Sequence, residues 1–342
     1  MLIIFLLIQS MPKALTYKNT RTSVVGQSFF LHEEYSRGFA YEGETHFIHY
    51  YGLGHGFCKV SLSRTVIEKK SGSLEDWVKR EFGAEDIEEM KTEVGTIVKG
   101  VWRPSLHSSQ DIYKALDVTE QEMRLSENAL RLLINKLDDI FLYIEPCAAS
   151  RDVYSHKTRE LLILACTELE NFWQYYAEKS RLSGSGKRLT TNDYAKLCKP
   201  LHLKEYQFTL NTYAGLPPLR PFEHWDTAKP TASLAWYDAY NKTKHDREKH
   251  FSQATLFHCI NAVVACLVMH CVKFSPYQMF GQTNAFSSII NQHFKAGLVE
   301  VDYRNFYLLQ VNPEHEERGK YLSLGSIDGD ASFLFKALDF TV

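Results

Sequence analysis

The 342-residue chain lacks several features that would assign it to a familiar class at once. Its formal net charge is only −2, so it has no overall basic field, and contact with nucleic acid would need a local basic patch. Its seven cysteines form no C-x-x-C pair, which argues against a zinc ribbon and against a disulfide framework. This use of cysteine favours a reducing, cytoplasmic location.

The short signatures of catalysis and cofactor binding are also missing. Residues 52–56 are rich in glycine, but neither a helix start nor Gly-Lys-Ser/Thr follows them, so a hairpin turn is expected in place of a phosphate loop. The chain has no H-E-x-x-H, no close Cys/His quartet, no G-x-S-x-G elbow and no paired-carboxylate signature. We therefore expect neither a metal ion nor a cofactor.

The N-terminus carries an apolar run at residues 2–8 that is too short to span a bilayer. A secretion signal would carry a basic segment before such a run, and none is present. The sequence favours a start at Met11 over secretion, and no membrane association is expected. Residues 1–22 are accordingly assigned to an N-terminal extension.

The amino-acid composition is typical of a globular protein with aromatic-rich cores, because 44% of the residues are hydrophobic and 13% are aromatic. Residues 23–116 are expected to form a mixed α/β domain. Segments 47–51 and 56–69 are rich in β-branched and aromatic residues and predict strands. Segment 74–82 predicts a short amphipathic helix, and 97–102 another strand.

Residues 117–276 have the spacing of long amphipathic helices and predict an antiparallel four-helix bundle. An irregular, proline-rich insertion is expected at 182–231, between the second helix and the third. Residues 277–342 predict a short mixed segment with strands at 298–303, 305–312 and 320–325 and a strand or helix at 332–340. The overall class is α+β and predominantly α-helical. The four helices are expected to begin near Thr119, Ser155, Ser233 and Lys249.

The most informative segment is 236–247, WYDAYNKTKHDR, in the predicted third helix. Tyr237, Asn241 and His245 are each four residues apart, so a helix places them on one face. Histidine is the usual general acid/base near neutral pH, so His245 is the candidate for that role, Asn241 would orient it or a ribose hydroxyl, and Lys244 would assist. This set suits phosphodiester chemistry without a metal.

Other side chains in or near this segment are candidates for substrate binding. Lys242 and Arg247 would hold a phosphate, and Arg159 on the second helix is a more remote candidate. Glu168 on the second helix would pair with His245 or Lys244. Three aromatic residues would stack on a base. They are Trp236, Tyr237 and Tyr240.

A plainer interpretation accompanies each of these assignments. Asn241 and His245 would simply cap the third helix, with the charges forming a solvated face, and the two interpretations of the cluster are about equally supported. For Glu168 an ordinary boundary position is favoured. For Trp236 and Tyr240 packing against the first two helices is favoured over stacking on a base.

The bundle with its Asn-x-x-x-His near the end of the third helix resembles the HEPN (higher eukaryotes and prokaryotes nucleotide-binding) superfamily. The resemblance covers residues 117–274. Many members are metal-independent ribonucleases whose motif is an Arg, often followed by a polar residue such as Asn, and a His a few positions further on. Asn241 and His245 match this motif, whereas Tyr240 occupies the Arg position. The resemblance implies a homodimer with the site where two bundles meet.

The sequence leaves three functions open. The first is an RNA-directed enzyme or toxin-like effector, with an antitoxin-type protein partner. The second is a module that binds RNA, a nucleotide or another protein without chemistry, which Tyr240 at the motif's Arg position favours. The third is a structural role in which the bundle serves for dimerisation.

Overall fold

The computed structural model describes residues 13–23, 30–106, 109–184, 188–211, 213, 215–311, 320–323 and 335–342. The fold is mixed α+β, with an N-terminal antiparallel sheet followed by helices that pack together, as the sequence predicts at this level. The chain divides into two compact units. Unit 1 comprises Met1–Ile97, Arg103–Ser105 and Asp302–Lys336, and unit 2 comprises Val98–Trp102, Leu106–Val301 and Ala337–Val342.

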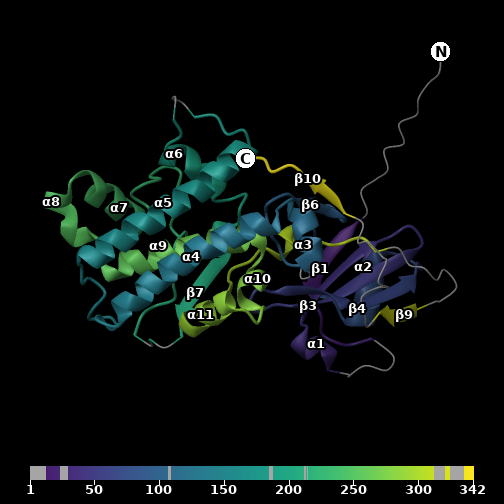
Figure 1. Cartoon of the computed structure of the whole chain (residues 1–342). Coiled ribbons are helices and arrows are strands. Elements are labelled where there is room, and N and C mark those ends of the chain that lie inside the picture. Colours follow the sequence, from purple (N-terminus) through teal and green to yellow (C-terminus); the bar gives the residue numbers. More distant parts are fainter. Residues whose placement is uncertain are drawn as a thin grey trace, which may run out of the picture. The chain divides into compact units, whose positions relative to one another are not determined.

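Unit 1 is built on a six-stranded antiparallel sheet with the strand order β5-β1-β2-β3-β4-β9 (Figure 1). One helix, α2, packs on it, and a short helix, α1, and a 3-10 turn, η4, complete the described part. β6 (Thr96–Val98) and β10 (Lys336–Leu338) straddle the boundary between the units. The other elements are β1 (Ala14–Lys18), α1 (Leu31–Glu34), β2 (Arg37–Glu42), β3 (His46–Leu53), β4 (Lys59–Lys69), α2 (Leu74–Phe82), β5 (Glu85–Glu89), η4 (Tyr303–Asn305) and β9 (Lys320–Ser323).

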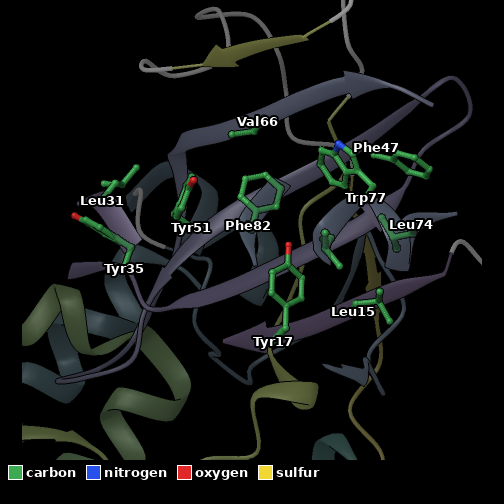
Figure 2. Packing of buried hydrophobic residues seen from close by; sticks show 12 residues of the cluster. Leu15, Tyr17, Leu31, Tyr35, Phe47, Tyr51, Val66, Leu74, Trp77 and Phe82 are labelled. Atoms are coloured by element: carbon green, nitrogen blue, oxygen red, sulfur yellow. The ribbon is translucent and has the colours of Figure 1, made fainter. Parts of the chain in front are cut away.

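The core of unit 1 lies between the sheet and α2, where aromatic side chains from both meet (Figure 2). Trp77 and Phe82 of α2 point onto the strands, and Trp77 stacks on Phe47 of β3 with ring centroids 5.2 Å apart. The opposite face of β3 is covered as well, since the Tyr50 hydroxyl donates to the Leu309 carbonyl at 2.6 Å. Burial on both faces explains why β3 does not alternate between apolar and polar residues.

The sheet begins earlier in the chain than the sequence predicts. β1 lies within residues 1–22, which the sequence sets apart as an extension, yet it is the second strand of the sheet and is almost wholly buried. The predicted strand at 97–102 is shorter, because β6 ends at Val98 and Gly100 then turns the chain with φ +75°. The predicted strands at 298–303 and 305–312 are not found as strands in the described residues: β8 ends at Leu298, and 299–311 contain the turn η4 and a single bridge residue, Gln310, although residues 306–309 are buried.

Unit 2 has three long helices, α4, α5 and α9, packed against one another (Figure 1). A shorter helix, α7, contacts α5 and α9. The elements are α3 (Ser109–Leu116), α4 (Glu120–Phe141), α5 (His156–Lys179), α6 (Thr191–Tyr194), η1 (Ala195–Leu197), η2 (Leu203–Glu205), β7 (Tyr206–Leu210), α7 (Ala235–His245), α8 (Arg247–His250), η3 (Phe251–Gln253), α9 (Leu256–Phe274), α10 (Pro276–Phe280), α11 (Ala285–His293) and β8 (Phe294–Leu298).

Capping side chains set the ends of these helices. Thr119 and Ser155 form capping boxes at the starts of α4 and α5, so these two helices begin where the sequence predicts. The predicted fourth helix starts later than Lys249, because Thr255 caps α9 by accepting the His258 amide. Residues 247–253 instead form the short turns α8 and η3. α9 is long and apolar enough to cross a membrane, but 83% of its apolar window is buried inside the fold, as in the core helix of a globular domain.

A short antiparallel pair of strands connects the insertion at 182–231 to the rest of unit 2. β7 pairs with β8 in antiparallel register, from Tyr206 opposite Leu298 to Leu210 opposite Phe294. The insertion expected to be irregular thus contains one strand, whose partner comes from the segment after α11. The loop that follows β7 packs its aromatic residues on α5, where Trp225 stacks on Trp173 at 4.9 Å.

Candidate functional site at the end of α7

α7 presents one buried face and one exposed face, and the predicted site residues are divided between them. The buried face consists mainly of aromatic residues, and Thr243 completes it. Asn241 is half-buried, while Lys242, Lys244 and His245 are exposed. The predicted row Tyr237–Asn241–His245 thus runs from the core to the surface at the C-terminal end of the helix.

Tyr237 is part of the core. Its hydroxyl donates to a Glu170 carboxylate oxygen at 2.8 Å, and its ring lies 5.0 Å from that of Trp173. Burial, reinforced by the Glu170 carboxylate, raises the pKa of Tyr237 well above its ordinary value. Because Tyr237 is a neutral, 5% exposed hydroxyl donor, it is not available to stack on a base. Its assignment to substrate binding is corrected to packing.

Tyr240 and Trp236 also serve packing. Tyr240 is fully buried, and Lys244 Nζ donates to its hydroxyl at 2.7 Å, an interaction that raises the pKa of Lys244. Trp236 Nε1 donates to the Pro221 carbonyl at 3.0 Å, so this buried indole packs against the insertion. Lys244 is consequently held along its own helix and is a weaker candidate for assisting chemistry than the sequence suggests.

The acidic residue that faces α7 is Glu170 and not Glu168. Glu168 accepts a long hydrogen bond of 3.4 Å from Asn171 of its own helix. Residues two apart on a helix point in nearly opposite directions, so only one of the two glutamates can face α7. The predicted pairing of Glu168 with His245 or Lys244 is therefore replaced by the pairing of Glu170 with Tyr237.

A guanidinium reaches the end of α7 from the neighbouring helix. Arg159 of α5 donates from Nη2 and Nε to the Thr243 carbonyl, at 3.0 and 3.3 Å. A cation there satisfies a carbonyl in the last turn and complements the negative end of the helix dipole. Arg159 thus positions the turn that carries His245 and does not pair with a carboxylate on the surface.

Asn241 and His245 have side chains free to contact a ligand. Within the described part of the chain, neither side chain has a hydrogen bond or an ion pair, and His245 is exposed. Lys242, by contrast, pairs with Asp238 of its own helix at 2.6 Å. The motif positions are accordingly accessible, but no carboxylate or second histidine orients the imidazole.

The surface around His245 combines Arg247, a predicted phosphate-binding residue, with aromatic residues that the sequence did not indicate. Arg247 lies over the ring of Phe251, with its guanidinium carbon 5.8 Å from the centroid. His156 and Tyr154 contact the same ring, at 4.8 and 5.4 Å. Tyr154 is 47% exposed. Only residue 246 separates His245 from Arg247 in the chain, so this ring cluster follows His245 directly.

The loop before α5 completes this surface. Its backbone is bound to the start of α9, because the Phe257 amide donates to the Arg151 carbonyl at 3.1 Å, and the Arg151 guanidinium lies 4.0 Å from the Phe257 centroid. We refer to the exposed residues gathered here as the α7–α8 surface. They are Arg151, Tyr154, His156, His245 and Arg247.

No metal or disulfide chemistry emerges from the described ranges. Within them, no group of three or more His, Cys, Asp or Glu side chains is placed to hold a metal ion. All seven cysteines are free thiols, and burial raises the pKa of Cys259 and Cys271 well above the ordinary value. His258 on α9 is satisfied by the Gln253 carbonyl at 2.8 Å, and burial lowers its pKa.

Comparison of the chain with protein-family models, with curated proteins and with solved structures found no match. The functional argument therefore rests on the residues of the α7–α8 surface.

Proposed function

We propose that unit 2 is a divergent HEPN-like four-helix domain formed by α4, α5, α7 and α9, and that it binds single-stranded RNA through the α7–α8 surface. The observation that carries the proposal is the exposed Tyr154 ring beside Phe251, with Arg151 and Arg247 on aromatic rings nearby. The location of α7 beside α5 and α9, with Asn241 and His245 at its end, supports the resemblance.

The chemistry of this surface favours stacking on bases over a purely electrostatic interaction. Base stacking on an aromatic ring stabilises a single-stranded complex by about 1–3 kcal/mol per base and tolerates any sequence. Asp152, Asp246 and Glu248 lie in the same segments, so the surface has no large excess of positive charge. Affinity should therefore depend on aromatic and guanidinium groups, with a shallow dependence on salt.

Replacement of Tyr154 by alanine is expected to weaken binding of a fluorescent single-stranded RNA about tenfold in an anisotropy titration, because one stacking platform is lost. Arg247→Gln should weaken binding and also lower its dependence on salt. Phe30→Ala is the matched control, because Phe30 is 64% exposed but belongs to unit 1. Equal affinities for all four proteins would contradict the proposal.

A second candidate is metal-independent cleavage of the bound RNA, with His245 as general acid/base and Asn241 orienting the ribose. It is favoured by the accessibility of His245 and by the absence of a bonding partner for Asn241 among the described residues. Tyr240 at the Arg position is buried, and Arg159 is a guanidinium that the fold brings to this turn from α5. A reducing, cytoplasmic location fits the seven free thiols.

We also propose that the protein is a homodimer associated through α4. Leu125 and Leu132 are seven residues apart, so they lie on one face of that helix, and they are 63% and 52% exposed. Light scattering should give twice the monomer mass for the full chain, and Leu125→Glu with Leu132→Glu should restore the monomer. A monomeric wild-type protein at micromolar concentration would exclude this association.

A further inference from the structure

A cavity of about 700 Å³ lies within unit 2, lined mostly by residues of the insertion. It is lined by the turns of residues 195–205, by the loop 225–227 and by Glu300. Its volume falls in the range of small-molecule sites. The lining combines lysines with the apolar surface of Cys198 and Trp225.

The walls of this cavity are fixed by the core beneath them. Leu197, Leu201 and Leu203 are buried and anchor the turns, which leaves the lysines between them exposed. Trp225 Nε1 donates to the Pro230 carbonyl at 3.0 Å and holds the loop on the other side. The cavity is therefore formed before any ligand binds, which reduces the entropic cost of binding.

Arg220 forms hydrogen bonds to two sides of the cavity. It makes a bidentate pair with Glu300, at 2.8 and 3.1 Å, and donates from Nη2 to the Lys204 carbonyl at 3.1 Å. Fork-to-fork pairing of this kind fixes geometry as well as charge. Glu300 is consequently neutralised by a residue behind the lining.

The remaining carboxylates of the lining are also engaged. Glu205 lies 3.3 Å from His202 Nδ1, and Asp226 Oδ1 accepts the Ala228 amide at 2.9 Å. Lys199 and Lys204, in contrast, have no ion pair with a carboxylate within the described residues. The cationic groups of the lining that have no carboxylate partner among the described residues are therefore these two ammonium groups.

The turn between the two lysines has an unusual backbone. His202 adopts the left-handed region, with φ 53° and ψ 34°, which is unfavourable for a residue with a side chain. This conformation ends the turn after Lys199 and starts η2, so that Lys199 and Lys204 border the same cavity. Strain of this kind persists where the surrounding structure over-determines it.

We propose that this cavity binds a small phosphate monoester that has an apolar body. Two ammonium groups match the double negative charge of the phosphate, and Trp225 and Cys198 supply the apolar wall for the rest of the molecule. The site shares no residue with the α7–α8 surface. Its test is therefore separate from that of the proposed RNA binding.

Phenyl phosphate is a suitable probe, with inorganic phosphate and phenol as its two halves. In calorimetric titrations of the full chain, phenyl phosphate should bind more tightly than inorganic phosphate, and phenol should not bind measurably. Lys199→Gln and Lys204→Gln should each weaken binding of phenyl phosphate about tenfold, because each removes a charge-assisted hydrogen bond. Lys295→Gln should have no effect, since Lys295 is an exposed lysine on β8 outside the cavity.

Three results would overturn the proposal. They are no binding of phenyl phosphate at millimolar concentration, equal affinity for inorganic phosphate, and undiminished binding by the double variant Lys199→Gln, Lys204→Gln. Both lysines are exposed, so the variants should fold, and an unchanged melting temperature without ligand would verify this.

Discussion

Acidification is expected to destabilise the protein strongly through one buried histidine of unit 2. His270 on α9 is fully buried, its Nδ1 is 2.9 Å from the Ser126 hydroxyl, and its ring packs beside Phe274 and Phe286. Burial, with the Lys273 charge nearby, lowers the pKa of His270 to about 3. The folded protein therefore holds this imidazole neutral in a range where the unfolded chain would protonate it.

The direction of the pH effect on stability follows from the lowered pKa of His270. The neutral imidazole contributes its full stabilisation above the unfolded pKa of about 6.5, and this contribution is lost as the pH falls towards about 3. The difference between the folded and unfolded pKa values corresponds to a loss of about 5 kcal/mol in the free energy of unfolding once the pH is below both values. This loss is comparable to the whole stability of many domains. Burial also lowers the pKa of His258 and His293, so these residues add to the loss in the same direction.

Urea unfolding at a series of pH values measures this effect. His270→Gln removes the titrating group while keeping an acceptor for Ser126, so its unfolding free energy should vary much less between neutral and acid pH. His224→Gln is the control, because the His224 side chain is 82% exposed. Parallel pH profiles of the wild type and His270→Gln would show that His270 does not carry the acid sensitivity.

Replacement of His245 by alanine is expected to slow RNA cleavage by a factor of about 10²–10⁴, the usual contribution of a positioned acid/base group. The assay is the decay of a labelled single-stranded RNA in excess chelator, with wild type and variant at equal concentration. RNA binding should change little, because the aromatic and guanidinium groups of the surface remain. Cleavage by the variant at the wild-type rate would exclude His245 from the chemistry.

A control variant separates the role of His245 from that of a contaminating nuclease. His224→Ala changes an exposed histidine in the same unit and should cleave as the wild type does. If chelated wild-type protein leaves diverse RNAs intact while still binding them, the cleavage proposal fails and the binding proposal stands. Asn241→Ala should then affect affinity alone.

The sequence predicted the helices well where local signals agreed. Segment 74–82 combines a 3.6-residue apolar period with Ser73 before it and Gly83 after it, and α2 has these bounds. β5, in contrast, was not predicted, because its sequence EDIEE has low strand propensity and it becomes a strand only by pairing with β1. That pairing joins segments about 70 residues apart, which local patterns do not reveal.

The candidate site was predicted in part. Four-residue spacing places Tyr237, Asn241 and His245 on one face of α7, but it does not reveal where along the helix the core ends, so it did not separate the buried Tyr237 from the exposed His245. The choice between Glu168 and Glu170 depended on how α5 is rotated towards α7. The position of Glu170, four after Cys166 and three before Trp173, was the available signal, since both of these are buried. The contacts of Tyr154 and Arg247 with Phe251 depend on loop packing and had no sequence signal.

The most direct test of RNA binding by the α7–α8 surface is a crosslinking map. The full chain would be irradiated with single-stranded RNA containing 4-thiouridine, and the crosslinked peptides identified by mass spectrometry. Crosslinks should fall within residues 151–156 and 245–251 and should decrease in Tyr154→Ala. Crosslinks confined to unit 1, or to the turns around the cavity at 195–205, would contradict the assignment of RNA binding to the end of α7.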